Sequence, residues 1–175
     1  MKVILTKINI RNLVLASVLA SLTCAATLVV TIPSPTGGYM NLGDTIVLLS
    51  AYLLGPWWGA AAAGIGSGLA DLMAGYAFYA PATILIKALM AVSAALLYRA
   101  LGRRPWAVIP CGLAAEAIMV LGYWGYDALL MGSLAGAAAG LPSNLTQGLF
   151  GLAASSALTL SMKASPSIRG KFPAL

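Results

Sequence analysis

The chain has 175 residues, of which 61% are hydrophobic and only 8% are charged, and its formal net charge is +6. A soluble domain is usually about 25% charged, so this composition excludes a soluble globular protein and predicts a polytopic membrane protein. The positive charge does not indicate a nucleic-acid binder, because nine of the ten basic residues lie at the chain ends or in one loop between apolar segments.

The apolar segments predict six membrane-spanning helices within one integral membrane domain, residues 1–175. We expect them, in chain order, at about residues 12–32, 42–54, 56–75, 81–101, 105–131 and 142–162. Prolines stand at or just before the start of four of these segments, where the missing N–H costs no helical hydrogen bond. A span needs roughly 20 apolar residues, so the second segment is short. The expected fold is all-α, a bundle of six transmembrane helices.

The basic residues predict the orientation of the bundle. They cluster near the N-terminus (Lys2, Lys7, Arg11), in the loop at 99–104, and near the C-terminus (Lys163, Arg169, Lys171). Cytoplasmic loops carry an excess of Lys and Arg, and six spans place all three clusters on one side. We expect a multi-pass protein of the cytoplasmic membrane of a prokaryote, with both termini in the cytoplasm.

The ionisable residues inside the apolar segments all fall between mid-membrane and the outer side. Such residues are costly in a membrane and usually face a partner or a cavity. Asp71 and Lys87 are expected to form a structural ion pair across the hairpin between the third and fourth spans. Asp44 is expected to anchor the preceding loop, with a helix N-cap as the simpler role. Asp127 is interpreted as an interfacial residue.

The remaining polar and aromatic residues of the outer half predict a small-molecule pocket. Glu116 lies near mid-depth, and buried carboxyl and amide groups need hydrogen-bond partners. Aromatic walls with a few polar contacts are typical of ligand sites. The expected substrate-binding residues are Tyr39, Asn41, Glu116, Tyr123, Trp124, Asn144 and Gln147.

Other classes of function leave no signature in the sequence. The chain has no histidine, no P-loop, no nucleophile elbow and no cysteine cluster, so we expect neither a metal site nor an enzyme. A self-sufficient carrier or channel, which could use the buried charges as an ion path, stays an alternative, as does a structural membrane subunit. Small residues recur at four-residue intervals on the first span, at Ala16, Ala20 and Cys24, a pattern that permits close helix contacts.

Two stretches resemble a known family. "NLGDTIVLLSAYLLGPWWGAAAAGIGSGLADL" followed by "GYAFYAPATILIKAL" is similar to the S components of energy-coupling factor (ECF) vitamin transporters, of the riboflavin-transporter type. That group also includes members linked to hydroxymethylpyrimidine and vitamin B6. "AEAIMVLGY" and "LPSNLTQGLFG" extend the likeness over about residues 12–160.

The resemblance implies a function that composition does not show. An S component binds a vitamin or precursor from outside and associates with a membrane-embedded T component and two ATP-binding-cassette ATPases. It delivers the ligand by toppling in the membrane. The chain would need no cofactor of its own, because the partner ATPases use the ATP. The family's T-component docking motif maps onto Ala16 and Ala20, and Cys24 continues that face.

For the substrate, one carboxyl and two amides among aromatic rings favour a compact heteroaromatic compound. A hydroxymethylpyrimidine or vitamin B6-like ligand is the first expectation, and riboflavin, which needs a longer pocket, is the alternative. The loop "PSPTGGYMN" is expected to act as a lid, with Gly37 and Gly38 supplying conformational freedom.

Overall fold

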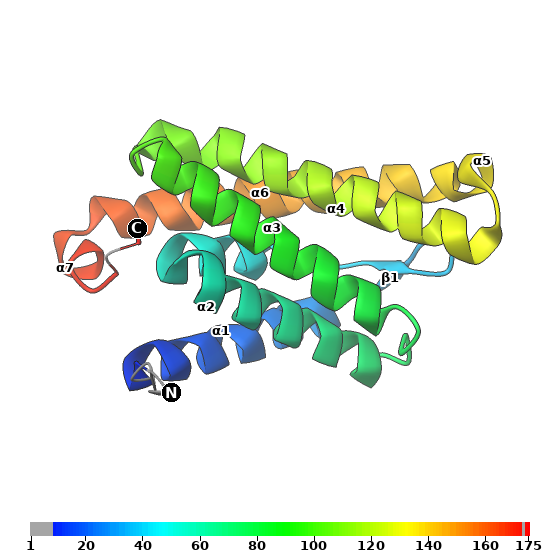
Figure 1. Cartoon of the computed structure of the whole chain (residues 1–175), viewed down its shortest axis with the longest axis horizontal. Coiled ribbons are helices and arrows are strands. Elements are labelled where there is room, and N and C mark those ends of the chain that lie inside the picture. The colour runs from blue at the N-terminus through cyan, green and yellow to red at the C-terminus, as the bar shows by residue number, and fades with distance from the viewer. Residues whose placement is uncertain (1–8, 173) are drawn as a thin grey trace, which may run out of the picture.

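A computed structural model describes residues 9–172 and 174–175. Five helices of 20 to 30 residues pack side by side, with a short hairpin and several single turns between them (Figure 1). The elements are α1 Ile10–Val29, β1 Ile32–Pro33, β2 Tyr39–Met40, α2 Asp44–Met73, α3 Ala80–Ala100, η1 Pro105–Ala107, α4 Val108–Met131, α5 Leu134–Ala137, η2 Ala138–Gly140, α6 Leu141–Ala164 and α7 Pro166–Arg169.

The helix α2 contains two of the six membrane helices. At Gly55 the backbone has φ 77° and ψ −171°, a left-handed conformation that favours glycine, and Pro56 follows it. The chain reverses there, and a Cβ added to Gly59 would lie 2.9 Å from the Ala51 Cα. Residues 44–54 and 56–73 therefore form a tight helical hairpin. The predicted all-α fold with six helices is confirmed.

The outer surfaces of these helices suit a lipid environment. Four stretches of the described chain are long and apolar enough to cross a membrane: Ile10–Val29, Asp44–Met73, Ala80–Ala100 and Pro105–Met131. Only 22% of the first stretch is buried inside the protein, and large apolar side chains such as Leu129 point outward. In a membrane such side chains contact lipid tails and need no protein partner.

The helix α1 approaches α2 most closely at Gly66. A Cβ at this position would lie 2.4 Å from the Ala20 carbonyl oxygen, so the two backbones touch across a glycine, as small-residue helix contacts allow. The same packing buries Ala16 and turns Ala20 and Cys24 toward α2. The face that was expected to dock a partner is therefore used inside the bundle.

We expect Gly66→Ala to lower the free energy of unfolding by about 1–3 kcal/mol, the usual cost of overpacking, because the contacting atom belongs to the backbone and cannot rotate away. Gly125→Ala in α4 is the matched control, since its Cβ would meet nothing within 4 Å. That substitution should raise stability by roughly 0.5–1 kcal/mol. Thermal unfolding midpoints in detergent would measure both, and equal shifts would contradict the close contact.

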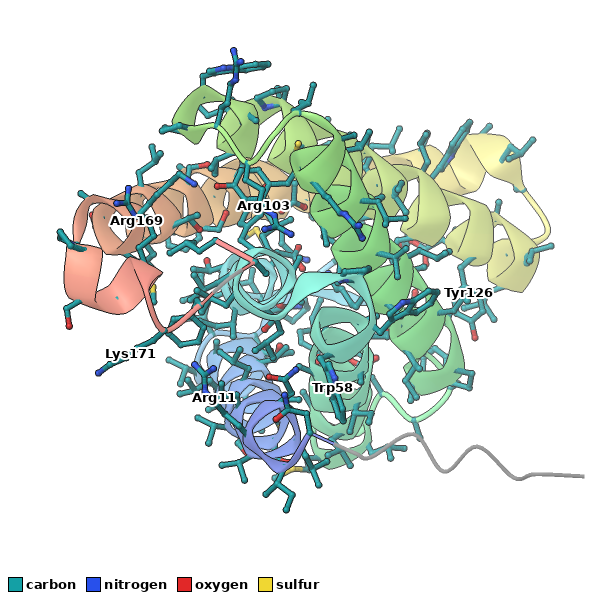
Figure 2. The ribbon with its side chains drawn as sticks, turned by 60° about the vertical axis from the view of Figure 1, so that its left-hand side comes forward. Arg11, Trp58, Arg103, Tyr126, Arg169 and Lys171 are labelled. Carbon is teal, nitrogen blue, oxygen red and sulfur yellow. The ribbon has the colours of Figure 1, made fainter. Side chains whose placement is uncertain are left out.

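The two ends of the bundle differ in charge. Figure 2 labels Arg11, Arg103, Arg169 and Lys171 toward the end where α1 begins and α7 lies, whereas Tyr126 lies toward the other end. Lys163 belongs to the basic end, where its Nζ donates to the Tyr98 hydroxyl over 2.8 Å. Lys2 and Lys7, which also entered the orientation argument, lie outside the described residues.

At the opposite end, residues 30–43 form a segment that we call the lid. Its strands β1 and β2 pair antiparallel, with Ile32 opposite Met40 and Pro33 opposite Tyr39. The turn between them includes Gly37 at φ 95°, a conformation that glycine adopts without strain. The lid runs beside the start of α3, the end of α4 and the start of α6 (Figure 1), and so positions its side chains over the polar residues of those helices.

Candidate functional site

The end of the bundle that carries the lid holds a pocket that the lid covers. Its walls come from five elements that are far apart in the sequence: the lid, the end of α2, the start of α3, the end of α4 and the start of α6. The lining residues are Ser34, Thr36, Gly38, Tyr39, Asn41, Asp71, Tyr79, Thr83, Tyr123, Asp127, Asn144 and Gln147. The free volume inside is only about 30 Å³, enough for a water molecule.

Gln147 connects the lid to the buried core of the site. Its Oε1 accepts from the Asn41 backbone N–H over 2.8 Å, and its Nε2 donates to Asp44 Oδ2 over 2.7 Å. The Asn41 side chain in turn accepts from the Gly43 N–H over 2.9 Å. Asn41 therefore satisfies an N–H group at the start of α2, and Gln147 fixes the position of Asn41.

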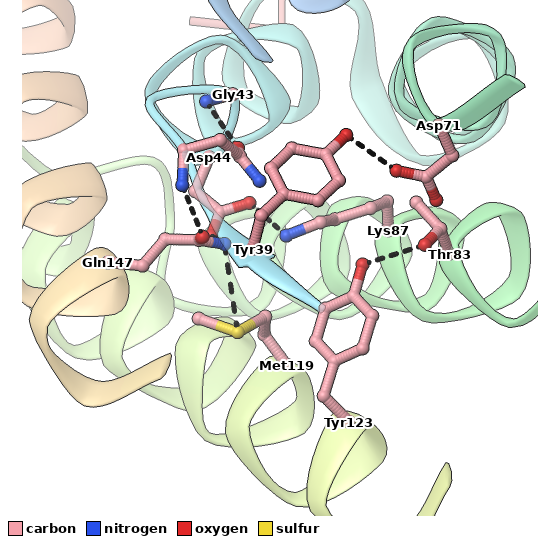
Figure 3. A network of polar contacts seen from close by, with 10 residues as sticks. Tyr39, Gly43, Asp44, Asp71, Thr83, Lys87, Met119, Tyr123 and Gln147 are labelled. Atoms are coloured by element: carbon pink, nitrogen blue, oxygen red, sulfur yellow. Dashed lines mark hydrogen bonds and ion pairs between the residues drawn. The ribbon is translucent and has the colours of Figure 1, made fainter. Parts of the chain in front are cut away.

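Asp44 is the counter-ion of Lys87. The two side chains form an ion pair in the core, where Lys87 is 2% exposed and Asp44 is fully buried (Figure 3). The Lys87 ammonium also lies 5.3 Å from the centre of the Tyr123 ring, a distance at which a cation is attracted to the ring face. Removing two charges from water is costly unless they are paired and hydrogen-bonded, and Asp44 meets this need with Lys87 and Gln147 together.

The expected Asp71–Lys87 pair is therefore wrong, and depth explains why. Asp71 lies two residues before the end of the helix at residues 56–73, whereas Lys87 lies seven residues into α3, which places Lys87 roughly 7 Å deeper at 1.5 Å per residue. Asp44 reaches the level of Lys87 because the lid dips into the bundle before α2 begins. Asp44 is also not the N-cap, since that position is taken by Gly43.

Two tyrosines hold the carboxylates of the pocket wall. The Tyr39 hydroxyl donates to Asp71 Oδ1 over 2.7 Å, and the Tyr79 hydroxyl donates to Asp127 Oδ1 over 2.6 Å. Burial raises the pKa of both phenols above the usual range, and the neighbouring carboxylates add to the shift. Both tyrosines therefore stay protonated and act as donors. Asp127 is buried within the site, so its interpretation as an interfacial residue is wrong.

Most of the expected binding residues meet in this pocket. Five of the seven line it: Tyr39, Asn41, Tyr123, Asn144 and Gln147. Trp124 does not, because its Nε1 donates to the Leu134 carbonyl over 3.1 Å and so ties α4 to α5. Trp124 follows Tyr123 directly, and one helical residue turns the side chain by about 100°, out of the pocket.

Glu116 also lies outside the pocket lining. It is 5% exposed and packs deeper in the bundle, where α4 meets α6. A Cβ at Gly148 would lie 3.2 Å from Glu116 Oε2, and one at Gly151 would lie 2.9 Å from Oε1. The two glycines of α6 thus make room for its carboxyl group near Asp44.

Four important lining residues were not among the expected binding residues: Asp71, Tyr79, Thr83 and Asp127. Helical spacing in the sequence could have identified all of these lining residues except Asp71. Tyr79, Thr83 and Lys87 stand four residues apart along α3, and Tyr123 and Asp127 stand four apart on α4. Residues at this spacing share one helix face. The hydrogen bond from the Tyr123 hydroxyl to Thr83 Oγ1, 3.0 Å long, joins the two faces (Figure 3).

Comparison with known proteins gives consistent results. A family model described as the ECF-type riboflavin transporter S component matches residues 7–164. A Pyrococcus woesei protein, known as an uncharacterized protein in the gap 3′ region, is 36% identical over 128 residues, which are 72% of this chain and 84% of that protein. A solved structure of the S component of a bacterial ECF transporter has a TM-score of 0.61 at 17% identity, covering 88% of this chain and 94% of that one.

Proposed function

Because this chain belongs to the family of ECF-type riboflavin transporter S components, we propose that it captures a flat heteroaromatic vitamin in the pocket beneath the lid. The family is one of substrate-binding transporter subunits and not of enzymes. The observation that carries the proposal is the convergence of five elements on one pocket with three tyrosines, two carboxylates and three side-chain amides. Aromatic faces for stacking and a few oriented polar groups are what such a ligand requires.

Riboflavin is the first candidate ligand, and the description of the family supports it. A hydroxymethylpyrimidine or vitamin B6-like compound is the second, because a single ring needs less added space than riboflavin in a pocket with a free volume of about 30 Å³. Either ligand needs space that the closed pocket lacks. We therefore propose that the lid moves outward on binding, pivoting where Asn41 meets Gln147.

Equilibrium binding to the purified full chain in detergent tests this proposal. Riboflavin, pyridoxine and 4-amino-5-hydroxymethyl-2-methylpyrimidine would each be titrated, with ligand or tryptophan fluorescence as the signal. We expect one of them to bind with a Kd below about 1 µM, which corresponds to about −8 kcal/mol. Absence of saturable binding for all three would contradict the proposed function.

The partners follow from the family and complete the proposal. We expect a T component and two ATP-binding-cassette ATPases to bind this chain, hydrolyse the ATP and drive the toppling that releases the ligand inside the cell. The basic end of the bundle faces the cytoplasm in this arrangement, and the lid faces outward, as the positive-inside rule expects. A self-sufficient carrier would instead transport the vitamin when reconstituted alone in liposomes.

The exposed side of α1 is the proposed docking surface for the T component. Since Ala16 is buried, the free small residues lie one position further along the chain. Ser17, Ser21 and Ala25 line a shallow groove there together with Val18 and Leu22. A groove of small residues allows a partner helix to approach closely.

We expect Ser21→Leu to reduce the amount of T component that copurifies with the chain by about 10-fold, a loss of about 1.4 kcal/mol, because the larger side chain fills the groove. Vitamin binding should be unchanged. The matched control is Leu149→Ala on α6, which alters an exposed apolar residue far from α1. Full copurification with Ser21→Leu would place the docking surface elsewhere.

A further inference from the structure

The charges in the pocket wall are all of one sign. Asp71 from α2 and Asp127 from α4 line it, and none of the described lining residues is basic. Each carboxylate accepts a hydrogen bond from one tyrosine, Tyr39 or Tyr79. Tyr39 belongs to the lid, so its phenol moves away from Asp71 if the lid opens, whereas Tyr79 directly precedes α3 and stays beside Asp127.

The nearest cation is already in use. Lys87 lies below the pocket, is 2% exposed, and is paired with Asp44, while the ring of Tyr123 lies 5.3 Å from its ammonium. To serve a ligand anion, Lys87 would have to leave Asp44 buried and unpaired, which is strongly unfavourable.

The wider charge distribution has the same sign. All four acidic residues of the chain, Asp44, Asp71, Glu116 and Asp127, lie from mid-bundle to the lid end, and Lys87 is the one base among them. Asp44 is offset by Lys87, so the acidic groups that face the pocket without a cation are Asp71 and Asp127. The other described basic residues, among them Arg103 and Lys163, belong to the opposite end.

From this arrangement we infer that the pocket takes its vitamin only in an uncharged or cationic form and rejects anionic forms such as the phosphate ester. Asp71 and Asp127 act as the specificity-determining residues: their carboxylates accept hydrogen bonds from hydroxyl or N–H groups of the ligand, Asp71 in place of the Tyr39 phenol and Asp127 beside the Tyr79 phenol. A ligand phosphate would face two carboxylates without a counter-ion, and like charges in an interface are a common device against the wrong ligand. The inference rests on the proposed function.

Pairs of compounds that differ only in a phosphate group test the inference on the unaltered protein. Riboflavin and riboflavin 5′-phosphate form one pair, and pyridoxamine and pyridoxamine 5′-phosphate form another. We expect the unphosphorylated member of any pair that binds to have a Kd at least about 100-fold lower than its phosphate, a difference of about 2.8 kcal/mol at 1.4 kcal/mol per tenfold.

Variants then assign the effect to the two carboxylates. Asp71→Asn and Asp127→Asn should each lower the ratio of the phosphate's Kd to the Kd of the unphosphorylated compound by about 10-fold, the equivalent of about 1.4 kcal/mol. Each substitution removes one charge and keeps the size of the side chain. Ser167→Lys is the matched control, since it makes the same change in net charge at an exposed residue of the basic end. It should leave the discrimination unchanged.

The outcomes separate the inference from the proposed function. Equal binding of the two members of a pair, or tighter binding of the phosphate, would overturn the inference while the vitamin-binding function stands. If the ratio of Kd values is unchanged in both Asp71→Asn and Asp127→Asn, these two carboxylates are not the cause of the discrimination. Failure of every compound to bind would overturn the proposed function and the inference together.

Discussion

Replacing Lys87 by methionine is expected to lower the free energy of unfolding by about 3–5 kcal/mol, the usual effect of removing one partner of a buried ion pair. The methionine side chain fits the space, but Asp44 is left as a fully buried charge with Gln147 as its remaining hydrogen-bond partner. Thermal or denaturant unfolding of the purified protein in detergent would measure the loss.

Two further variants show whether the pairing causes that loss. In the double variant Asp44→Asn with Lys87→Met, the uncompensated charge is gone, so much of the lost stability should return. Arg99→Met is the matched control, because it removes the same charge from an exposed position on the same helix, α3, where effects are usually within about 0.5 kcal/mol. A double variant no more stable than Lys87→Met would argue against the Asp44–Lys87 pair.

Replacing Gln147 by leucine should weaken vitamin binding by about 100-fold, or about 2.8 kcal/mol. The substitution keeps the side-chain size but leaves both the Asn41 N–H and Asp44 Oδ2 without this partner. An unsatisfied buried donor or acceptor costs about 1–3 kcal/mol, and more when it is charged. The lid would lose the contact with α6 about which it pivots, and its position over the bound ligand would be destabilised. Titration with riboflavin and with pyridoxine would measure the change.

Thr146→Leu provides the comparison for Gln147→Leu. Thr146 precedes Gln147 on α6, but it is exposed and its hydroxyl donates to the Pro142 carbonyl of its own helix, 2.9 Å away. The same gain in apolar surface on the outer face should leave the Kd unchanged. Similar losses in the two variants would indicate a general effect on α6 and not a loss of the lid contact.

The general architecture could be predicted from the sequence because the lipid environment restricts it. Backbone polar groups in a bilayer must be satisfied within a helix or a closed barrel, so six apolar segments imply six helices. Prolines near the starts of the segments were useful boundary signals. The break at Gly55 was predicted in this way, because Pro56 marks the start of the third segment, and in the structure a left-handed glycine divides the two helices there.

The pairing of buried charges could not be predicted in the same way. Sequence proximity favoured Asp71 for Lys87, but the depth of each residue decides its partner, and depth depends on how far the lid enters the bundle. The short helix at residues 44–54 starts below the outer end of its neighbours, which brings Asp44 to the level of Lys87. No local sequence pattern indicates that the helix at residues 44–54 starts at this depth.

The pocket was predicted in part, for reasons of helical register. Asn144 and Gln147, three residues apart, share a face of α6 and were expected together. Trp124 was grouped with Tyr123 by proximity along the chain, although adjacent helical residues point in different directions. Register applied to α3 and α4 would have added Tyr79, Thr83 and Asp127, whereas the lid residues are positioned by tertiary contacts alone.

The central claim, that the pocket beneath the lid holds a vitamin, is tested most directly by identifying the small molecule that the purified protein carries. The full chain would be purified without added ligand and denatured, and the released compounds would be analysed by mass spectrometry beside Gln147→Leu prepared in parallel. We expect a flavin, pyrimidine or pyridine vitamin in unphosphorylated form, released from the unaltered protein and strongly depleted in Gln147→Leu. Equal amounts of the same vitamin from both proteins, or a protein that carries none and binds none when they are added, would contradict it.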